Sequence, residues 1–332
     1  MMCFTDLLPY FLLIFPRSFA SIEIESKEII MKRILTYTIE TETTVGDFLK
    51  SQGYSRSVIV HLKKTPNSLM NGDRWLYVRD RLYPGDVLTV TLLETESSEK
   101  IPPVPMALDI VYEDEDILVL NKPADTPIHP SLHNYENTLA NGVADYFSRQ
   151  GDAYVFRCLN RLDRDTTGLT ILAKHMLSAS ILSKDIVKRQ VQRTYLAIVD
   201  GNLTGSGTID APIGREDGSV ITRCIDYEHG EHAITHYRSL AHRDGLTLVS
   251  LRLETGRTHQ IRVHMKHLGY PLIGDYLYHP DMSRISRQAL HSYRLEFTHP
   301  ITKKAMELTA PLPSDMERLF PSQLSGNKDS DH

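Results

Sequence analysis

The residue types best suited to chemistry occur together in one short stretch, residues 160–169. Its carboxylate, Asp163, stands two residues after Arg161 and just ahead of a small polar turn at 166–168. The apolar run that follows, 169–173, predicts a buried strand. A carboxylate on a tight turn beside a strand is held rigidly and faces the surface, where catalytic groups usually lie. We therefore expect Asp163 to take part in catalysis.

A phosphatase is one candidate for that chemistry. Residues 163–167 fit the Asp-x-Asp-x-Thr pattern of haloacid-dehalogenase-type phosphatases, in which the first Asp attacks phosphorus and both carboxylates help to bind Mg²⁺. Asp275 and Asp281 would then imitate the late acidic motif. That pattern requires an apolar strand running into the first Asp, however, and Asn160 and Arg161 interrupt the preceding residues. The phosphatase is therefore the less favoured alternative.

Histidines and cysteines are the candidate metal ligands of the sequence. The two histidine groups are His229, His232 and His236, and His259, His264 and His267. Neither has a glutamate placed as in a His-Glu-x-x-His helix, so no metal site is expected. The cysteines, Cys3, Cys158 and Cys224, are odd in number and lack metal-ligand spacing. They predict free thiols in a reducing cytoplasm, with Cys158 buried in a core strand rather than reactive.

The overall composition sets wide limits on function. The 332 residues are 41% hydrophobic and 24% charged, which is ordinary for a globular protein large enough for one sizeable and one small domain. A net charge of −5 and a pI near 6.3 give no overall nucleic-acid footprint. A binding face can still be basic while the rest of the surface is acidic.

Four sequence blocks carry a family resemblance. They are Asn121-Lys122-Pro123, the run 160–169, Arg193-Thr194-Tyr195-Leu196-Ala197, and residues 256–264 with Gly274-Asp275 beyond. In this order, over about residues 108–313, they resemble the RluA-type pseudouridine synthases, RNA-modifying enzymes whose nucleophile is the aspartate of an Arg-Leu-Asp triplet. The resemblance implies an isomerase that needs no metal, nucleotide or flavin.

The resemblance also implies roles for individual residues. Asp163 would attack the target ribose, either at C1′ as a nucleophile or by taking the C2′ proton, and both routes stay open. Arg262 resembles the arginine that pairs with this aspartate. Tyr195 resembles the tyrosine that stacks on the flipped uracil and can help to remove the C5 proton. Arg161 resembles the residue that holds the base out of its stack.

Further residues are expected to touch the RNA. Asn160, Arg257 and His259 join Arg161 as substrate-binding candidates, and Arg164 is expected to contact phosphate. Many family members have His where Asn160 stands. We expect that difference to alter the position of the loop or its RNA contacts rather than to abolish the chemistry.

A small module precedes the catalytic region. Thr44 and Ser55 are expected to cap two helices, the second spanning 56–64, and an Asn-Gly turn at 71–72 predicts a hairpin. This order resembles the S4 RNA-binding module, with Arg56, Lys63 and Lys64 as its RNA contacts. The alternative is a small α+β accessory domain whose basic residues are merely solvated.

The chain thus predicts an α+β protein in five segments. These are an N-terminal extension at 1–32, disordered or upstream of a start at Met31; the S4-like domain at 33–96; a stiff linker at 97–106; the catalytic domain at 107–316, with a large mixed, mostly antiparallel sheet; and a disordered tail at 317–332. The apolar run near the N-terminus is too short to span a bilayer.

Function follows from these expectations. We predict a monomeric, cytoplasmic pseudouridine synthase without a membrane partner, acting on structured RNA. The S4-like module favours ribosomal over transfer RNA. A non-catalytic RNA-binding or ribosome-assembly factor remains the alternative, disfavoured because Asp163, Tyr195 and Arg262 are all present.

Overall fold

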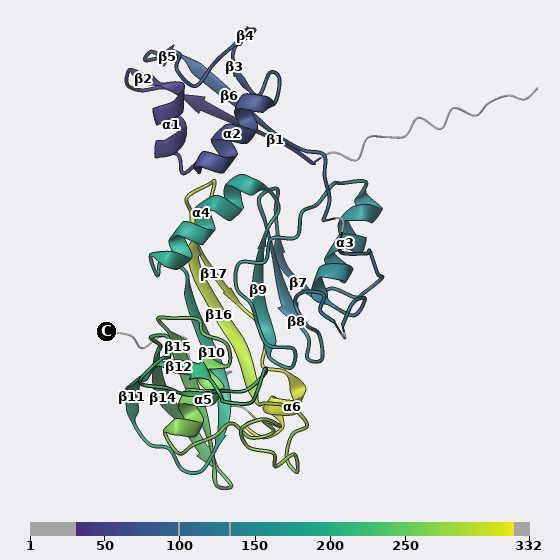
Figure 1. Cartoon of the computed structure of the whole chain (residues 1–332), viewed down its shortest axis with the longest axis vertical. Helices are drawn as coiled ribbons and strands as arrows, with labels where there is room; N and C mark the ends of the chain where they lie inside the picture. The colour runs from purple at the N-terminus through teal and green to yellow at the C-terminus, as the bar shows by residue number, and fades with distance from the viewer. Residues whose placement is uncertain (1–30, 99, 133, 322–332) are drawn as a thin grey trace, which may run out of the picture.

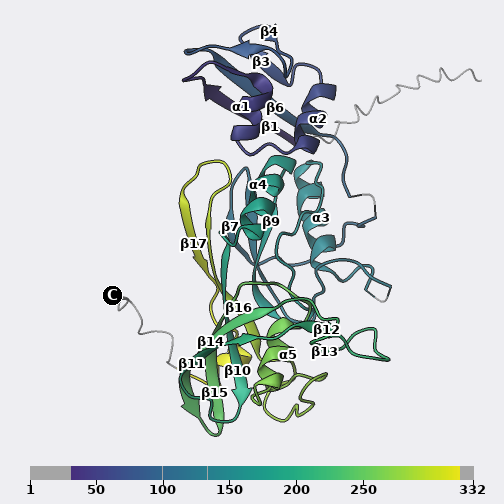
Figure 2. The same ribbon diagram turned by 60° about the vertical axis from the view of Figure 1, so that its left-hand side comes forward.

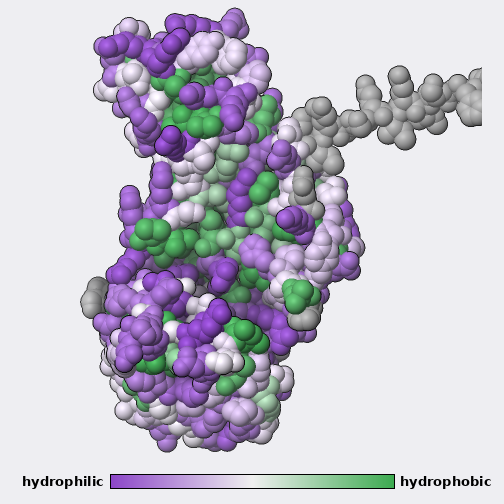
Figure 3. Space-filling model, in the orientation of Figure 1, coloured by the Kyte–Doolittle hydropathy of each residue, from purple (hydrophilic) through white to green (hydrophobic). Residues whose placement is uncertain are grey.

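The computed structural model describes residues 31–98, 100–132 and 134–321, which form two units. A small N-terminal unit lies at one end, and a larger unit built on one long sheet extends from it (Figure 1). Helix α4 (Met176–Val187) of the larger unit faces the small one in the turned view as well (Figure 2). Below the small unit, hydrophobic side chains gather in the middle of the face (Figure 3).

The N-terminal unit packs two helices on a four-stranded antiparallel sheet. The sheet has the order β1-β6-β3-β4, with strands at Met31–Thr38, Val87–Glu94, Leu69–Asn71 and Arg74–Trp75. The helices are α1 (Val45–Ser51) and α2 (Arg56–Lys64), and a short pair joins β2 (Thr43–Thr44) to β5 (Arg81–Leu82). This is the predicted order of helix, helix and hairpin.

The start signals of both helices are confirmed. The side chain of Thr44 accepts a hydrogen bond from the backbone N–H of Asp47, and Ser55 does the same for Val58. The hairpin prediction was one residue early, because Asn71 pairs with Arg74 and leaves the two residues 72–73 as the turn.

The larger unit is organised by a nine-stranded sheet. Its order is β11-β14-β15-β10-β16-β9-β8-β7, and β17 pairs with β16. In chain order the strands are β7 (Ile110–Glu113), β8 (Ile117–Lys122), β9 (Thr167–Ala173), β10 (Gln192–Asp200), β11 (Ser206–Asp210), β14 (Ile234–Arg243), β15 (Leu246–Leu253), β16 (Leu290–Thr298) and β17 (Ala305–Thr309). Only β9 and β16 pair in parallel. The prediction of a large mixed, mostly antiparallel sheet is confirmed.

The remaining elements of this unit lie around the sheet. They are α3 (Leu139–Gln150), α5 (Gln260–His267), α6 (Ser314–Glu317) and the hairpin of β12 (Ile213–Arg215) and β13 (Arg223–Ile225). Gly151 follows α3 in the left-handed conformation, which ends the helix. Within the part of the chain that the structure describes, no helix is long and apolar enough to cross a membrane.

The described residues shift the outer ends of two predicted segments. Strand β1 already begins at Met31, inside the predicted extension, of which 1–30 lie outside the described residues. The linker predicted at 97–106 contacts the larger unit, where Asn141 of α3 donates a hydrogen bond to the Pro102 carbonyl at 2.8 Å. The predicted disordered tail is wrong as far as residue 321, because Phe320 is buried in the core beneath α6; residues 322–332 lie outside the description.

A buried ion-pair network joins the two units. Arg33 of β1 donates through Nε to Asp116, at the start of β8, over 2.8 Å. The same carboxylate lies 2.9 Å from His175 Nε2, at the N-terminus of α4. Nearby, Lys184 of α4 donates to the Gly53 carbonyl at 3.0 Å, which adds a second contact between the units.

Candidate active site

The Asp163 loop is anchored on a fully buried strand. The Thr166 N–H donates to the Asp163 carbonyl at 3.1 Å, so the turn spans residues 163–166, slightly earlier than the predicted 166–168, and every residue of β9 behind it is buried. At the head of the loop, the Asn160 amide donates to the Leu169 carbonyl at 3.0 Å and accepts from the Ile171 N–H at 2.8 Å. The loop is therefore fixed to the middle of the sheet.

These bonds change the interpretation of Asn160. It was expected to bind substrate, but it is buried and both ends of its amide are engaged by the β9 backbone. Asn160 thus positions the loop, which is one of the two consequences expected from Asn in place of the family's usual His.

Gly168 brings this loop against the neighbouring strand. Its φ of +105° favours glycine, and a Cβ there would lie 2.2 Å from the Ser292 carbonyl oxygen of β16. The glycine therefore permits the single parallel pairing of the sheet, between β9 and β16. Next to it, Thr167 Oγ1 at the start of β9 lies 2.9 Å from His291 Nδ1 of β16, which adds a side-chain contact between the two strands.

Lys122 fixes the other side of the loop, a role that sequence reasoning missed. Its buried ammonium donates to the carbonyls of Pro123, Thr126 and Arg164 at 2.7, 2.9 and 2.8 Å. Arg164 directly follows Asp163, so the lysine holds the backbone next to that carboxylate. Burial lowers the pKa of Lys122 to about 7, and the three carbonyl oxygens compensate for the lost water. The Asn-Lys-Pro block was the available signal.

Arg262 connects the loop to α5. Its Nη1 donates to Asp163 Oδ2 at 3.1 Å, which brings together residues 99 positions apart. Its Nε and Nη2 each donate to Asp275 at 2.7 Å, a bidentate pair that holds the guanidinium plane. Burial opposes the charge of Arg262, but the bonds and charges of Asp275 and Asp163 outweigh it and raise the pKa.

The exposure of the two carboxylates differs sharply. Asp275 has no exposed side-chain surface, whereas 28% of the Asp163 side chain is accessible. Asp275 therefore orients the arginine, and Asp163 is the carboxylate of the two that remains accessible. Sequence reasoning had noted Asp275 within a block but gave it no part in this site.

His259 stands at the N-terminus of α5, beside the same carboxylate. Its φ of +57° is uncommon for a residue other than glycine and points to backbone strain at this position. Nδ1 lies 2.8 Å from the Tyr278 hydroxyl, and Nε2 lies 3.9 Å from Asp163 Oδ2. Burial lowers the pKa of His259, so the ring is neutral at neutral pH.

Tyr195 enters the site from β10. The pairing of β10 with β16 shifts register at this point, since Thr194 faces Arg294 but Tyr195 faces Ser292. Such a bulge re-aims the side chains beside it. Tyr195 is largely buried, and its remaining surface lines the same cleft as Asp163.

A cleft of about 780 Å³ unites these residues. Its walls include Asp163, Tyr195, His259 and Arg262. Three of the predicted RNA-contacting arginines are exposed at this cleft: Arg161, Arg164 and Arg257. Arg164 also pairs with Asp165 at 3.1 Å, and Arg257 with Glu231. Arg56, Lys63 and Lys64 lie elsewhere, exposed on α2.

The alternative chemistries fit this geometry poorly. Asp163 precedes its strand, whereas the phosphatase pattern needs a strand entering the aspartate, and Asp165 is buried and paired with Arg164. Within the described residues, neither histidine group brings its ring nitrogens together as metal ligands. Burial raises the pKa of Cys158 to about 11, so its thiol stays protonated.

Comparisons with known proteins agree with the site. A family model described as RNA pseudouridylate synthase matches residues 116–267. The chain is 41% identical over 278 residues to the uncharacterised RNA pseudouridine synthase YjbO of Bacillus subtilis, covering 83% of this chain and 98% of that protein. The chain belongs to the RluA-type family of RNA pseudouridine synthases. The phosphatase alternative is therefore wrong.

Other relatives extend this comparison. The synthase is 37% identical over 281 residues to ribosomal large subunit pseudouridine synthase D of Escherichia coli K12, covering 80% of this chain and 86% of that protein. Among solved structures, human RNA pseudouridylate synthase domain containing 1 matches with a TM-score of 0.52 and 30% identity, over 63% of this chain and 85% of that one. The pseudouridine-synthase fold of the larger unit is thus shown.

Proposed function

We propose that Asp163 is the attacking carboxylate of this RNA pseudouridine synthase. The observation that carries the proposal is its bond to Arg262 at 3.1 Å while its side chain remains accessible from the cleft. The guanidinium of Arg262 holds the carboxylate in place, and Asp275 holds the arginine. An ionised, rigidly held carboxylate is what either attack at C1′ or removal of the C2′ proton requires.

The reaction exchanges one bond within a single nucleotide. The N-glycosidic bond between ribose C1′ and uracil N1 breaks, the freed base turns, and a bond forms between C1′ and C5. The C5 proton leaves, and N1 gains a proton. In this proposal Tyr195, which lines the cleft, stacks on the uracil during this turn, and the exposed Arg161 holds the nucleotide out of its helix.

We further propose that the substrate is ribosomal RNA, with transfer RNA as the second candidate. Support comes from relatives named for the ribosomal large subunit, at 37% to 39% identity. The N-terminal unit, in this proposal an S4-like module, presents Arg56, Lys63 and Lys64 on the exposed face of α2, where they would contact phosphate. The monomeric state and the cytoplasmic location remain predictions.

Mapping of pseudouridines in a strain that lacks this protein tests both proposals. We expect defined sites in ribosomal RNA to lose the modification. The wild-type gene should restore them, and Asp163→Asn should not. Asp125→Asn is the matched control, since Asp125 is an exposed carboxylate near the loop whose left-handed backbone Asn tolerates.

Two results would contradict these proposals in different ways. If Asp163→Asn restores every site, Asp163 is not the attacking group. If the sites that disappear lie in transfer RNA alone, the substrate is wrong while the chemistry stands. A growth or ribosome-assembly defect rescued equally by Asp163→Asn would favour the non-catalytic RNA-binding alternative.

A further inference from the structure

Two aromatic side chains stand exposed on the N-terminal unit, far from the catalytic cleft. Trp75, on edge strand β4, is 41% accessible, and Tyr77 is 55% accessible. Their rings stack at 5.6 Å between centroids with an interplanar angle of 26°. The guanidinium carbon of Arg79 lies over the Tyr77 ring, 5.8 Å from its centroid. We call Trp75, Tyr77 and Arg79 the aromatic platform.

A small cavity adjoins the aromatic platform. Its volume is about 300 Å³, and the platform and Lys63 of α2 form its rim. Its floor consists of the buried side chains Leu62, Leu69 and Leu76. An apolar floor with aromatic and cationic walls suits a flat, partly polar ring system.

The backbone holds the aromatic platform in place before anything binds. Leu76, between the two aromatics, is buried and donates to the Leu69 carbonyl at 2.8 Å. The Tyr77 N–H donates to the Asp80 carboxylate at 2.9 Å, which closes the turn. The Val78 carbonyl accepts from Gly46 of α1 at 2.8 Å. A ligand therefore loses little affinity to ordering of this surface.

The charges around the cavity favour an anionic ligand. Within the described residues, neither Lys63 nor Arg79 takes part in an ion pair or side-chain hydrogen bond, and no carboxylate residue lines the cavity. The chain's own proline-rich segment is engaged elsewhere, since Pro102 accepts a bond from Asn141 of α3. A stack of two rings with a guanidinium, flanked by a lysine, offers π-faces for a base and cations for its phosphates.

We propose that the aromatic platform and its cavity bind an unpaired nucleobase of the RNA substrate. The proposal rests on the assignment of RNA as the substrate and adds a second contact to it. In both ribbon views, the β3–β4 hairpin lies at the end of the N-terminal unit away from α4 (Figures 1 and 2). The bound base is therefore remote from the target uridine. The site contributes to the selectivity and affinity for RNA, not to the chemical step.

Trp75 is the only tryptophan of the chain, so its fluorescence reports on this site alone. An unstructured oligoadenylate of about twelve nucleotides should quench that fluorescence in the full-length protein at low salt, and added NaCl should reverse the quenching. Tyr77→Ala should weaken the binding about tenfold, since base–aromatic stacking has roughly that strength. Tyr77→Phe should preserve it, and Lys63→Ala with Arg79→Ala should flatten the salt dependence.

Controls separate this site from the catalytic one. Tyr83→Ala removes an equally exposed tyrosine of the same unit that has no ring partner within the described residues, and should bind as wild type. Asp163→Asn should quench as wild type even if it makes no pseudouridine, so a failure of the catalytic proposal leaves this test intact. Quenching that is absent, or unchanged in Tyr77→Ala, would overturn the proposal. So would quenching by a proline-rich peptide but not by oligoadenylate.

Discussion

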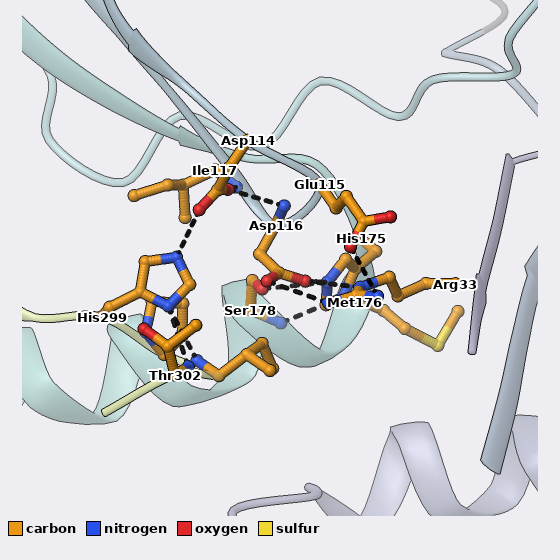
Figure 4. A network of polar contacts seen from close by, with 12 residues as sticks. Arg33, Asp114, Glu115, Asp116, Ile117, His175, Met176, Ser178, His299 and Thr302 are labelled. Carbon is orange, nitrogen blue, oxygen red and sulfur yellow. Dashed lines mark hydrogen bonds and ion pairs between the residues drawn. The ribbon is translucent and has the colours of Figure 1, made fainter. Parts of the chain in front are cut away.

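Two buried ion-pair networks of this enzyme use the same side-chain types for different ends. In the active site, Arg262 is central and bonds to Asp163 and Asp275. At the boundary between the units, a carboxylate is central, and Asp116 accepts bonds from Arg33 and His175 (Figure 4). The two networks differ in whether their carboxylate remains accessible from outside.

Asp116 uses both of its carboxylate oxygens within the network. Its Oδ1 receives Arg33 Nε at 2.8 Å and His175 Nε2 at 2.9 Å, and its Oδ2 receives Arg33 Nη2 at 3.3 Å. The side chain is only 4% accessible. Asp163, by contrast, uses one oxygen for Arg262 and keeps 28% of its surface open. A buried carboxylate bonded through both oxygens joins elements together, whereas an oriented and accessible one is available to a substrate.

Neutralising the two carboxylates should separate these roles, and the largest effect is expected at Asp163. We expect Asp163→Asn to slow pseudouridine formation by at least about a thousandfold, since the attacking group is lost. Its free energy of unfolding should change by less than about 0.5 kcal/mol, because Arg262 keeps its bonds to Asp275. Tritium release from RNA labelled at uridine C5 measures the rate, and urea unfolding the stability.

Asp116→Asn is the matched variant and should behave in the opposite way. Activity per folded molecule should stay within about threefold of wild type, because Asp116 lies at the unit boundary and not among the residues lining the cleft. A large activity loss in folded Asp116→Asn would show that the boundary network also controls the chemistry.

The sequence could predict the pair of Asp163 and Arg262 but not what holds it. The pair belongs to two sequence blocks with a recognisable family pattern. Asp275 and Lys122 also lie in such blocks, yet their roles depend on which buried atoms they meet after folding. Lys122 is 42 residues from the Arg164 carbonyl it binds, and no local periodicity encodes that contact. Asn160 likewise bonds to a strand 9 and 11 residues ahead.

The fold shows the same distinction between local signals, which the sequence reveals, and long-range contacts, which it does not. Caps at Thr44 and Ser55 depend on neighbours three residues away, so the helix starts were readable from the sequence. The parallel pairing of β9 with β16 joins residues over 120 positions apart and depends on the close approach at Gly168. Burial of Phe320 depends on core residues such as Leu196 and Leu248, which lie far from it in the sequence.

The second-largest effect is expected at Asp275. Asp275→Asn leaves Arg262 buried with only one carboxylate and turns an amide N–H towards its donors. Breaking a buried pair of this kind should lower the free energy of unfolding by about 3 kcal/mol. Activity should also fall, because Arg262 loses the contact that orients it towards Asp163. Asp281→Asn, an exposed carboxylate nearby, is the control and should change neither quantity; an Asp275→Asn protein as stable as wild type would refute this role.

A smaller stability effect is expected for Asp116, and it should depend on pH. Burial raises the pKa of Asp116, but hydrogen bonds from His175 and Arg33 outweigh burial and lower it to about 2, against 3.8 for an unperturbed Asp. This contribution, about 2 kcal/mol, is therefore complete above pH 3.8 and lost as the pH falls towards 2.

Acid unfolding of two variants tests that pH dependence. The free energy of unfolding of Asp116→Asn should differ less and less from that of wild type as the pH falls from 3.8 towards 2. Glu115→Gln, which removes an exposed partner of Arg33, should cost less than about 0.5 kcal/mol at any pH. A constant difference for Asp116→Asn down to pH 2 would show that the carboxylate is not held ionised by the network.

The smallest effect concerns His259, the titratable neighbour of the open carboxylate. Because burial lowers the pKa of His259 below its ordinary range, the ring gains a proton only in acid. The charged ring, 3.9 Å from Asp163 Oδ2, would then compete with the substrate for that oxygen, so activity should decline on the acid side. His259→Asn keeps a residue that tolerates the left-handed backbone but cannot titrate. It should reduce the rate at neutral pH by less than about tenfold and remove the acid decline. An unchanged decline in His259→Asn would show that a group other than His259 causes it, and the role given to this ring would be wrong.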